Sequence, residues 1–352
     1  MLLTVYVDDL LLMGTSQRCE AVATQLATSF ELVALGPVKY LLGVEVVVDR
    51  ELSTVFFSQA AYIEELLRRF HMKDCRGVAT PEGGTSDIDK ERVDATQMNT
   101  LPYREIIGAL QYLVSGSRPD IAHVVRRLGQ YMSNYGANHF AQAKRVLRYL
   151  KATKDFGLKM KVTGSAEVEL LRLEAYSDAD YANDQQDRQS ISGYVTMLNG
   201  SVVSYGSRKQ GLNAQSTMEA ECVAMNEGAR DVMWLRGLCD ELMWKYAVPT
   251  LWCDNTAAIS LFKRPGKHNG SKHIENRYHY VRNLEERELI AVRHCRTDQM
   301  TADIFTKPLA RIKFAQFREM LGVGRRDQQG GAVEAEDDRA ASVCMVVMFA
   351  AK

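Results

Sequence analysis

Four acidic side chains in the C-terminal half stand where separate predicted elements begin or end. Predicted strands lead into Asp178 and Asp254, Glu219 falls in the first turn of a long predicted helix, and Asp303 lies on a short one. Carboxylates gathered from separate elements repel one another unless cations neutralise them. Their oxygen atoms suit Mg²⁺ or Mn²⁺, and two such ions would support phosphodiester hydrolysis. Taken singly, each acid is better explained as a cap or a turn residue than as a catalytic one, so the hypothesis depends on their convergence.

Glu219 and Glu221 compete for one position in this hypothesis. Ser216 and Glu219 fit a capping box, which would give Glu219 a structural role at the start of the helix. Glu221 lies two residues further, about 200° around the helix, so both cannot face one site. Local chemistry alone leans slightly to Glu221 as the metal ligand.

The segments around these acids predict an α/β domain with a mixed five-stranded sheet over residues 166–323. Asn199-Gly200 lies between two β-prone runs and indicates a tight hairpin, because both turn positions need a positive φ. The expected strands are 168–176, 192–198, 201–206, 250–253 and 289–294, and the expected helices are 217–246, 256–263, 273–288 and 299–306.

Residues 101–161 form a basic, helix-periodic stretch in which eleven Lys and Arg stand against three acidic residues. Aromatic residues alternate with these cations, as in surfaces that follow a nucleic-acid backbone. A solvated helix face above an aromatic core explains the pattern equally well. The candidate nucleic-acid contacts are Arg126, Arg127, Lys144, Arg145, Arg148 and Lys151.

The N-terminal end carries a second acidic feature, Asp8-Asp9, between two β-prone apolar runs. This pattern predicts a hairpin over 2–13 with two carboxylates at its tip. A helix over 17–30, a strand over 40–48 and a helix over 58–70 should follow. An acidic linker is expected over 81–100, and a disordered tail over 324–352.

Composition limits the class of protein. The chain has 352 residues, 46% apolar and 25% charged, and the Lys and Arg equal the Asp and Glu at 44 each. This composition indicates a globular, multidomain protein. No apolar run approaches the length of a membrane span, and seven scattered cysteines favour reduced thiols, so we expect an intracellular, cytoplasmic or nuclear protein. The spacing of the histidines and cysteines fits no closed zinc site.

Six ordered motifs in the C-terminal part resemble the RNase H domain of Ty1/copia-type retrotransposon Pol polyproteins. They are SDAD at 177–180, QSISGY at 189–194, EAE at 219–221, CDN at 253–255, KHI with RYH at 272–279, and ADIFTKPL at 302–309. YVDD at 6–9 resembles the active-site hairpin of that family's reverse transcriptase, and residues 36–46 and 103–161 resemble the segments that join the two domains. The match covers nearly everything except the tail.

This resemblance implies an RNase H-like endonuclease that cuts RNA in RNA–DNA hybrids with two Mg²⁺ or Mn²⁺ ions. Asp178, Glu219, Asp254 and Asp303 would be its catalytic metal ligands; the helix start resembles RNases H at Glu219, and this decides for Glu219 over Glu221. The implied organisation is reverse transcriptase over 1–80, linker, basic helical connection over 101–165, RNase H-like domain over 166–323, and tail. Because the chain begins close to the hairpin, we expect Asp8 and Asp9 to be a relic polymerase site. Hybrids and the rest of a Pol polyprotein are the expected partners. A non-catalytic nucleic-acid-binding remnant and an inert fragment are the alternatives.

Overall fold

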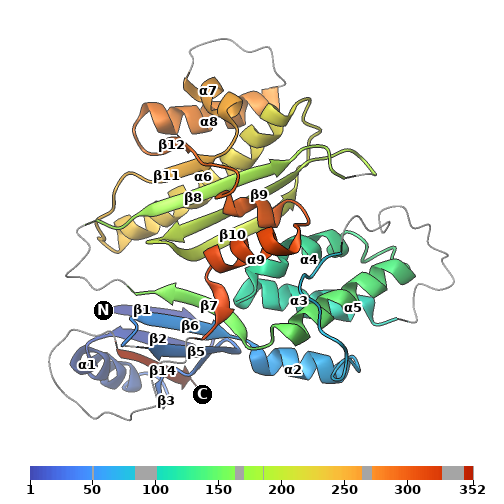
Figure 1. Cartoon of the computed structure of the whole chain (residues 1–352). Coiled ribbons are helices and arrows are strands. Elements are labelled where there is room, and N and C mark those ends of the chain that lie inside the picture. The colour runs from blue at the N-terminus through green and yellow to red at the C-terminus, as the bar shows by residue number, and fades with distance from the viewer. Residues whose placement is uncertain are drawn as a thin grey trace.

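The architecture consists of three β-sheets with helices packed between and around them (Figure 1). The computed structural model describes residues 1–49, 51–83, 101–162, 170–184, 186–263, 272–326 and 345–351. The expected linker lies largely outside these residues, as does most of the expected tail.

The sheet that carries the predicted metal ligands has five strands in the order β10-β9-β8-β11-β12. Its strands are β8 (Leu173–Asp180), β9 (Ile191–Leu198), β10 (Ser201–Lys209), β11 (Thr250–Cys253) and β12 (Ala291–His294). The first three pair antiparallel, and β11 pairs parallel with both β8 and β12. Asn199 and Gly200, both with positive φ, form the β9–β10 turn. The prediction of a mixed five-stranded, RNase H-like α/β domain is therefore confirmed.

Helices cover both faces of this mixed sheet. One face packs against α6 (Thr217–Glu241), α7 (Thr256–Lys263) and α8 (Lys272–Glu286), and the other against η3 (Thr301–Phe305) and α9 (Arg311–Met320). Gly193 of β9 allows η3 to approach closely, because a Cβ there would lie 2.7 Å from Thr306 Cγ2. The expected last helix over 299–306 corresponds to η3, whereas α9, which begins at Arg311, was not predicted.

A helical connection packs against the same face as η3. It comprises α3 (Tyr103–Gly116), η2 (Pro119–Ile121), α4 (Ala122–Gly129) and α5 (Ala137–Ala152). Its aromatic and aliphatic residues share one core with Val195 and Met197 of β9 and Phe305 of η3. Fully buried Arg118 donates hydrogen bonds to Asp120 at 2.9 and 2.8 Å, so the buried charge is paired. The connection and the mixed sheet therefore share a continuous interior.

A second sheet, in the order β13-β7-β6-β5-β4, crosses the expected domain boundaries. Its strands are β4 (Tyr40–Leu41), β5 (Val44–Asp49), β6 (Thr54–Ser58), β7 (Phe156–Lys161) and β13 (Val323–Arg325), and α2 (Ala60–Arg69) follows β6. The expectation of a wholly helical segment over 101–165 is wrong at its end, because β7 pairs with β6. The sheet joins three parts of the chain that sequence reasoning treated separately.

A third sheet, in the order β1-β2-β14-β3, surrounds the N-terminal hairpin. It contains β1 (Leu2–Tyr6), β2 (Asp9–Gly14), β3 (Leu32–Pro37) and β14 (Met345–Ala351), with α1 (Ser16–Ala27) beside it. The hairpin is confirmed. The prediction of disorder over 324–352 is wrong for β14, whose backbone pairs with both β2 and β3. Hydrogen bonds to β2 and β3 make this segment a strand, although the local sequence did not predict one.

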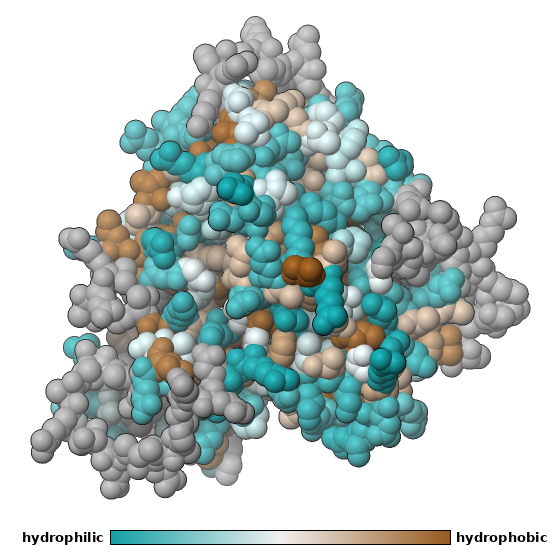
Figure 2. All heavy atoms as spheres, in the orientation of Figure 1, coloured by the Kyte–Doolittle hydropathy of each residue, from teal (hydrophilic) through white to brown (hydrophobic). Residues whose placement is uncertain are grey.

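The surface on the side shown in Figure 2 is mainly hydrophilic, with small apolar areas between charged side chains. Among the described residues, no helix combines the length and the apolar character needed to cross a bilayer.

Candidate metal-binding active site

Asp178 lies on β8, the central strand of the mixed sheet. It stands opposite Gly193 of β9 and is only 3% exposed. The Thr306 hydroxyl donates a hydrogen bond to Asp178 Oδ2 at 2.5 Å, and Lys307 Nζ lies 3.4 Å from the same oxygen. The end of η3 therefore supplies the polar partners of this buried carboxylate.

Glu221, rather than Glu219, faces Asp178 from α6. Ser216 caps the helix by accepting a hydrogen bond from the Glu219 amide, and the Glu219 carboxylate reaches back to accept one from the Gln215 amide at 2.7 Å. Glu221 points inward and is 6% exposed. The structure thus does not bring the predicted ligand Glu219 to the site, because the capping arrangement holds it at the outer end of the helix.

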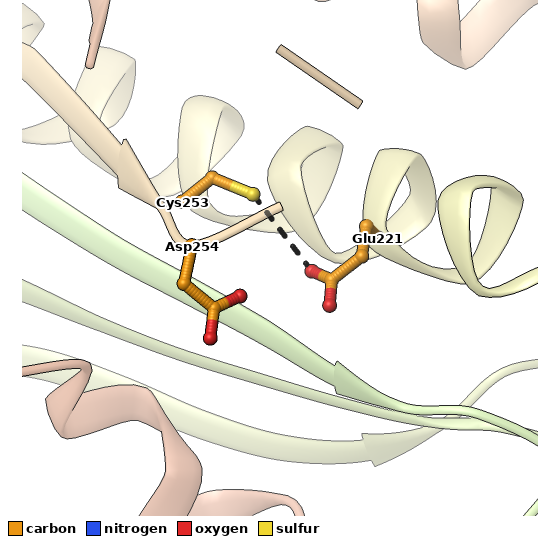
Figure 3. A group of neighbouring side chains, drawn as sticks. All are labelled: Glu221, Cys253 and Asp254. Carbon is orange, nitrogen blue, oxygen red and sulfur yellow. Dashed lines mark hydrogen bonds between the residues drawn. The ribbon is translucent and has the colours of Figure 1, made fainter. Parts of the chain in front are cut away.

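Asp254 follows the last residue of β11 and approaches Glu221. Figure 3 shows Glu221 reaching from α6 toward Cys253, with the Asp254 carboxylate beside them. One ligand atom from each of these three residues lies within 4.8 Å of the others. Thr297 donates a hydrogen bond to Asp254 Oδ2 at 3.0 Å. The carboxyl end of β11 and the first turns of α6 therefore bring two acids together.

Asp303 approaches the site from the opposite side, on η3, and is fully buried. Lys307 Nζ lies 2.9 Å from Asp303 Oδ1, and Lys313 Nζ lies 2.5 Å from Oδ2. Because Lys307 also contacts Asp178, it links the two carboxylates. Three of the four predicted ligands, Asp178, Asp254 and Asp303, therefore lie at one place, and Glu221 completes the set.

Burial of like charges shifts the protonation of this cluster. Burial raises the pKa of Asp178 to about 7; Lys307 opposes the rise, and Asp303 and Asp254 add to it. Burial also raises the pKa of Glu221 well above its usual value, and Asp178 and Asp254 contribute. Although burial works against it, the charges of Asp178 and Asp303 raise the pKa of Lys307. The site therefore attracts positive charge.

Asp180 is a further carboxylate beside the cluster that sequence reasoning did not select. It lies two residues after Asp178 on β8 and therefore on the same face of the strand. Burial raises its pKa, while Lys307 and His123 of α4 oppose the rise. The signal in the sequence was the Asp-x-Asp spacing at the end of a strand. The helical connection thus comes within electrostatic range of the site.

The donor set fits a hard divalent cation. Asp178, Glu221, Asp254 and Asp303 offer carboxylate oxygens, the ligands preferred by Mg²⁺ and Mn²⁺. Cys253 adds no suitable donor, because burial and the nearby Glu221 raise the pKa of its thiol well above the usual value and keep it neutral. The chemistry of this chain's own residues therefore favours oxygen coordination.

Several of the residues predicted to contact nucleic acid already bind other groups of the protein. Arg127 forms an ion pair with buried Glu82, Arg145 Nη2 lies 3.3 Å from Thr80 Oγ1, and Arg148 donates to the Arg76 carbonyl at 2.8 Å. These interactions hold residues 76–82, which include the start of the expected linker, against the connection. Arg126, Lys144 and Lys151 are half-buried, and Lys144 lies over the Phe140 ring. Lys144 and Lys151 remain the better candidates for phosphate contact.

Asp8 and Asp9 lie away from this cluster. Val7, with φ of 51°, begins the turn between β1 and β2; Asp8 is exposed within it, and Asp9 starts β2. The N-terminal sheet and the mixed sheet share no strand, so these two acidic features are separate.

Solved structures with a similar fold include RNase H1 from the archaeon Halobacterium salinarum, at 15% identity and a TM-score of 0.29. The match covers 38% of this chain and 94% of that one. Another is LC11-RNase H1, solved in complex with an RNA/DNA hybrid, at 12% identity and a TM-score of 0.30, covering 38% and 93% of the two chains.

Sequence comparison extends over most of the chain. Residues 1–83 match the family model of reverse transcriptase (RNA-dependent DNA polymerase). The retrovirus-related Pol polyprotein from transposon TNT 1-94 of Nicotiana tabacum is 34% identical over 92% of this chain, and that from transposon RE2 of Arabidopsis thaliana is 34% identical over 91%. The chain spans 24% and 21% of the lengths of these two relatives. It belongs to the Ty1/copia-type retrotransposon Pol polyprotein family.

Proposed function

We propose that this chain carries an RNase H-type nuclease over about residues 166–323, which hydrolyses the RNA strand of RNA–DNA hybrids with divalent metal ions. The observation that carries the proposal is that Asp178, Glu221, Asp254 and Asp303 converge at one place on the mixed sheet. Buried acids from four separate elements are costly for the fold unless they bind cations, so their assembly supports a binding role. Family membership adds the expectation of a nucleic-acid substrate.

The residues of the site would hold and orient the reacting groups. Asp178 would stand between the two halves of the site, with Glu221 and Asp254 on one side and Asp303 on the other. Thr306 would fix the orientation of the Asp178 carboxylate through its hydrogen bond. Bound divalent cations would supply the chemistry of activating water and neutralising charge on the phosphate. Two ions are part of the proposal.

Substrate would be held through its backbone. A hybrid is recognised by shape, phosphates and 2′-hydroxyl groups across a shallow minor groove, without base readout. Lys144 and Lys151 of α5 would contribute to phosphate binding, and the binding would weaken as salt concentration rises.

The deciding experiment is hybrid cleavage by the purified full chain. We expect cleavage of the RNA strand with Mg²⁺ or Mn²⁺, none in excess EDTA, and none above background for Asp178→Asn. The matched control is Asp8→Asn, which removes the same charge at the N-terminal hairpin and should cleave like wild type. Equal cleavage by wild type and Asp178→Asn would refute the proposal.

The alternative is a nucleic-acid-binding protein without catalysis. Lys307 and Lys313 neutralise Asp303 directly, which would let the acidic cluster serve as a structural ion-pair network. This alternative predicts hybrid binding without cleavage, unaffected by Asp254→Asn. The metal-dependent assay above separates the two functions.

A further inference from the structure

One side of the acidic cluster already contains a cation that belongs to the protein. Lys307 Nζ lies 3.4 Å from Asp178 Oδ2 and 2.9 Å from Asp303 Oδ1. Lys307 follows Asp303 by four residues, and its side chain is 32% exposed. The ammonium group therefore bridges the two carboxylates from a position that is open to solvent on one side.

The other side of the cluster is different. Glu221 and Asp254 approach each other beside Cys253, with ligand atoms within 4.8 Å. Within the described part of the chain, no lysine or arginine forms an ion pair with either carboxylate. The ion-pairing lysines that the structure describes at the cluster therefore lie on Asp178 and Asp303, and the charge of Lys307 reaches Glu221 only at longer range.

We propose that Lys307 is an internal counter-cation that makes metal loading sequential. The first divalent ion binds among Asp178, Glu221 and Asp254, and the position between Asp178 and Asp303 accepts a second ion only after Lys307 has moved away. This inference rests on the proposed metal-binding function and adds a residue that controls it.

The physical reason is electrostatic exclusion. An ammonium group and a divalent cation compete for the same two carboxylate oxygens, because positive charges repel each other more strongly in a buried site than in water. Lysine is suited to such displacement, since its charge sits at the end of a flexible four-carbon stem. Lys313 stays on Asp303 Oδ2 in either state and limits the charge left unpaired when Lys307 leaves.

The test measures metal binding directly, without substrate or activity. Mn²⁺ is titrated into the full chain, and free Mn²⁺ is followed by electron paramagnetic resonance, which gives both affinity and number of ions. We expect wild type to bind one ion and then a second about tenfold more weakly or worse. In Lys307→Met the second affinity should improve by about tenfold or more, because the competing charge is gone.

The matched control is Lys209→Met. Lys209 pairs with Asp184 and Asp187 outside the cluster, so its loss removes the same charge elsewhere and should leave Mn²⁺ binding as in wild type. If Lys307→Met does not fold without metal, Lys307→Gln serves in its place, because the amide can still donate hydrogen bonds to carboxylates but carries no charge.

The outcomes separate this inference from the proposed function. If wild type and the Lys307 variant bind the second ion equally well, the sequential-loading inference is overturned while the metal site stands. If wild type binds no Mn²⁺ beyond the level of Asp178→Asn, both the metal site and the inference are overturned. Improvement in Lys209→Met equal to that in Lys307→Met would also overturn the inference, since a general charge effect would explain both.

Discussion

The Asp8–Asp9 hairpin and the acidic cluster on the mixed sheet differ in the residues that surround them. Asp8 is exposed in a turn, where water solvates its charge. Asp178 and Asp303 are buried, and lysine side chains lie against them. Adjacent acids in a motif are therefore a weaker indication of a metal site than distant acids that the fold buries together.

The largest expected effect is on hybrid cleavage, and it should differ between variants of Glu221 and Glu219, which lie within one turn of α6. We expect Glu221→Gln to reduce hybrid cleavage by about 10²–10³-fold, because it removes a carboxylate that faces Asp178. Glu219→Gln should change cleavage by about twofold or less, since Glu219 only accepts a hydrogen bond from the Gln215 amide. Steady-state cleavage of a labelled hybrid measures both. The reverse order of effects would return the catalytic role to Glu219.

The burial of Asp178 should appear in the pH dependence of stability. Its pKa is raised to about 7 in the folded, metal-free protein, so between about pH 4 and 7 the folded state holds a proton that the unfolded chain releases. The contribution of Asp178 to the free energy of unfolding is therefore greatest at the acidic end of this range, and it is lost as the pH rises through 7. From about pH 5 to pH 8, wild type should lose roughly 3 kcal/mol more than Asp178→Asn.

Urea unfolding in EDTA at these two pH values gives the comparison. Asp8→Asn, in the exposed turn, should follow wild type. Parallel pH profiles for wild type and Asp178→Asn would contradict the buried environment of Asp178.

A smaller effect is expected at the basic helix α5. If Lys144 and Lys151 contact phosphate, replacing each by Gln should reduce the slope of log affinity against log salt by about one. Lys209→Gln is the matched control, because it removes the same charge from β10, where Lys209 pairs with Asp184 and Asp187. Fluorescence anisotropy with an uncleavable hybrid in EDTA measures the slopes. Unchanged slopes would place the phosphate-binding surface elsewhere.

The smallest effect is expected at the hairpin. Asp8→Asn should change the free energy of unfolding by less than about 0.5 kcal/mol, as is usual for an exposed position without a buried partner. Thermal unfolding with and without Mn²⁺ is the measurement. A loss of Mn²⁺-induced stabilisation in this variant would show that the hairpin also binds metal, and the contrast between the two acidic features would then fail.

Local patterns predicted the parts of the fold that depend on neighbouring residues. The Asn199-Gly200 turn and the strand that ends before Asp254 were both found where the sequence placed them. Glu219 was preferred over Glu221 by likeness to other helices, whereas the outcome depends on which side of α6 packs against β8. Strands β7, β13 and β14 were not predicted because their partners are far away in the sequence. The role of Lys307 depends on Asp178, more than a hundred residues earlier, and has no local signal.

The shared interior of the connection and the mixed sheet has a practical consequence. Val195, Met197 and Phe305 belong to one hydrophobic core with side chains of α3 and α4, so an isolated fragment of residues 166–323 would expose part of that core. The exposed apolar surface would promote self-association. The smallest fragment that keeps this core is therefore longer than the acidic motifs suggest, and should start upstream of α3.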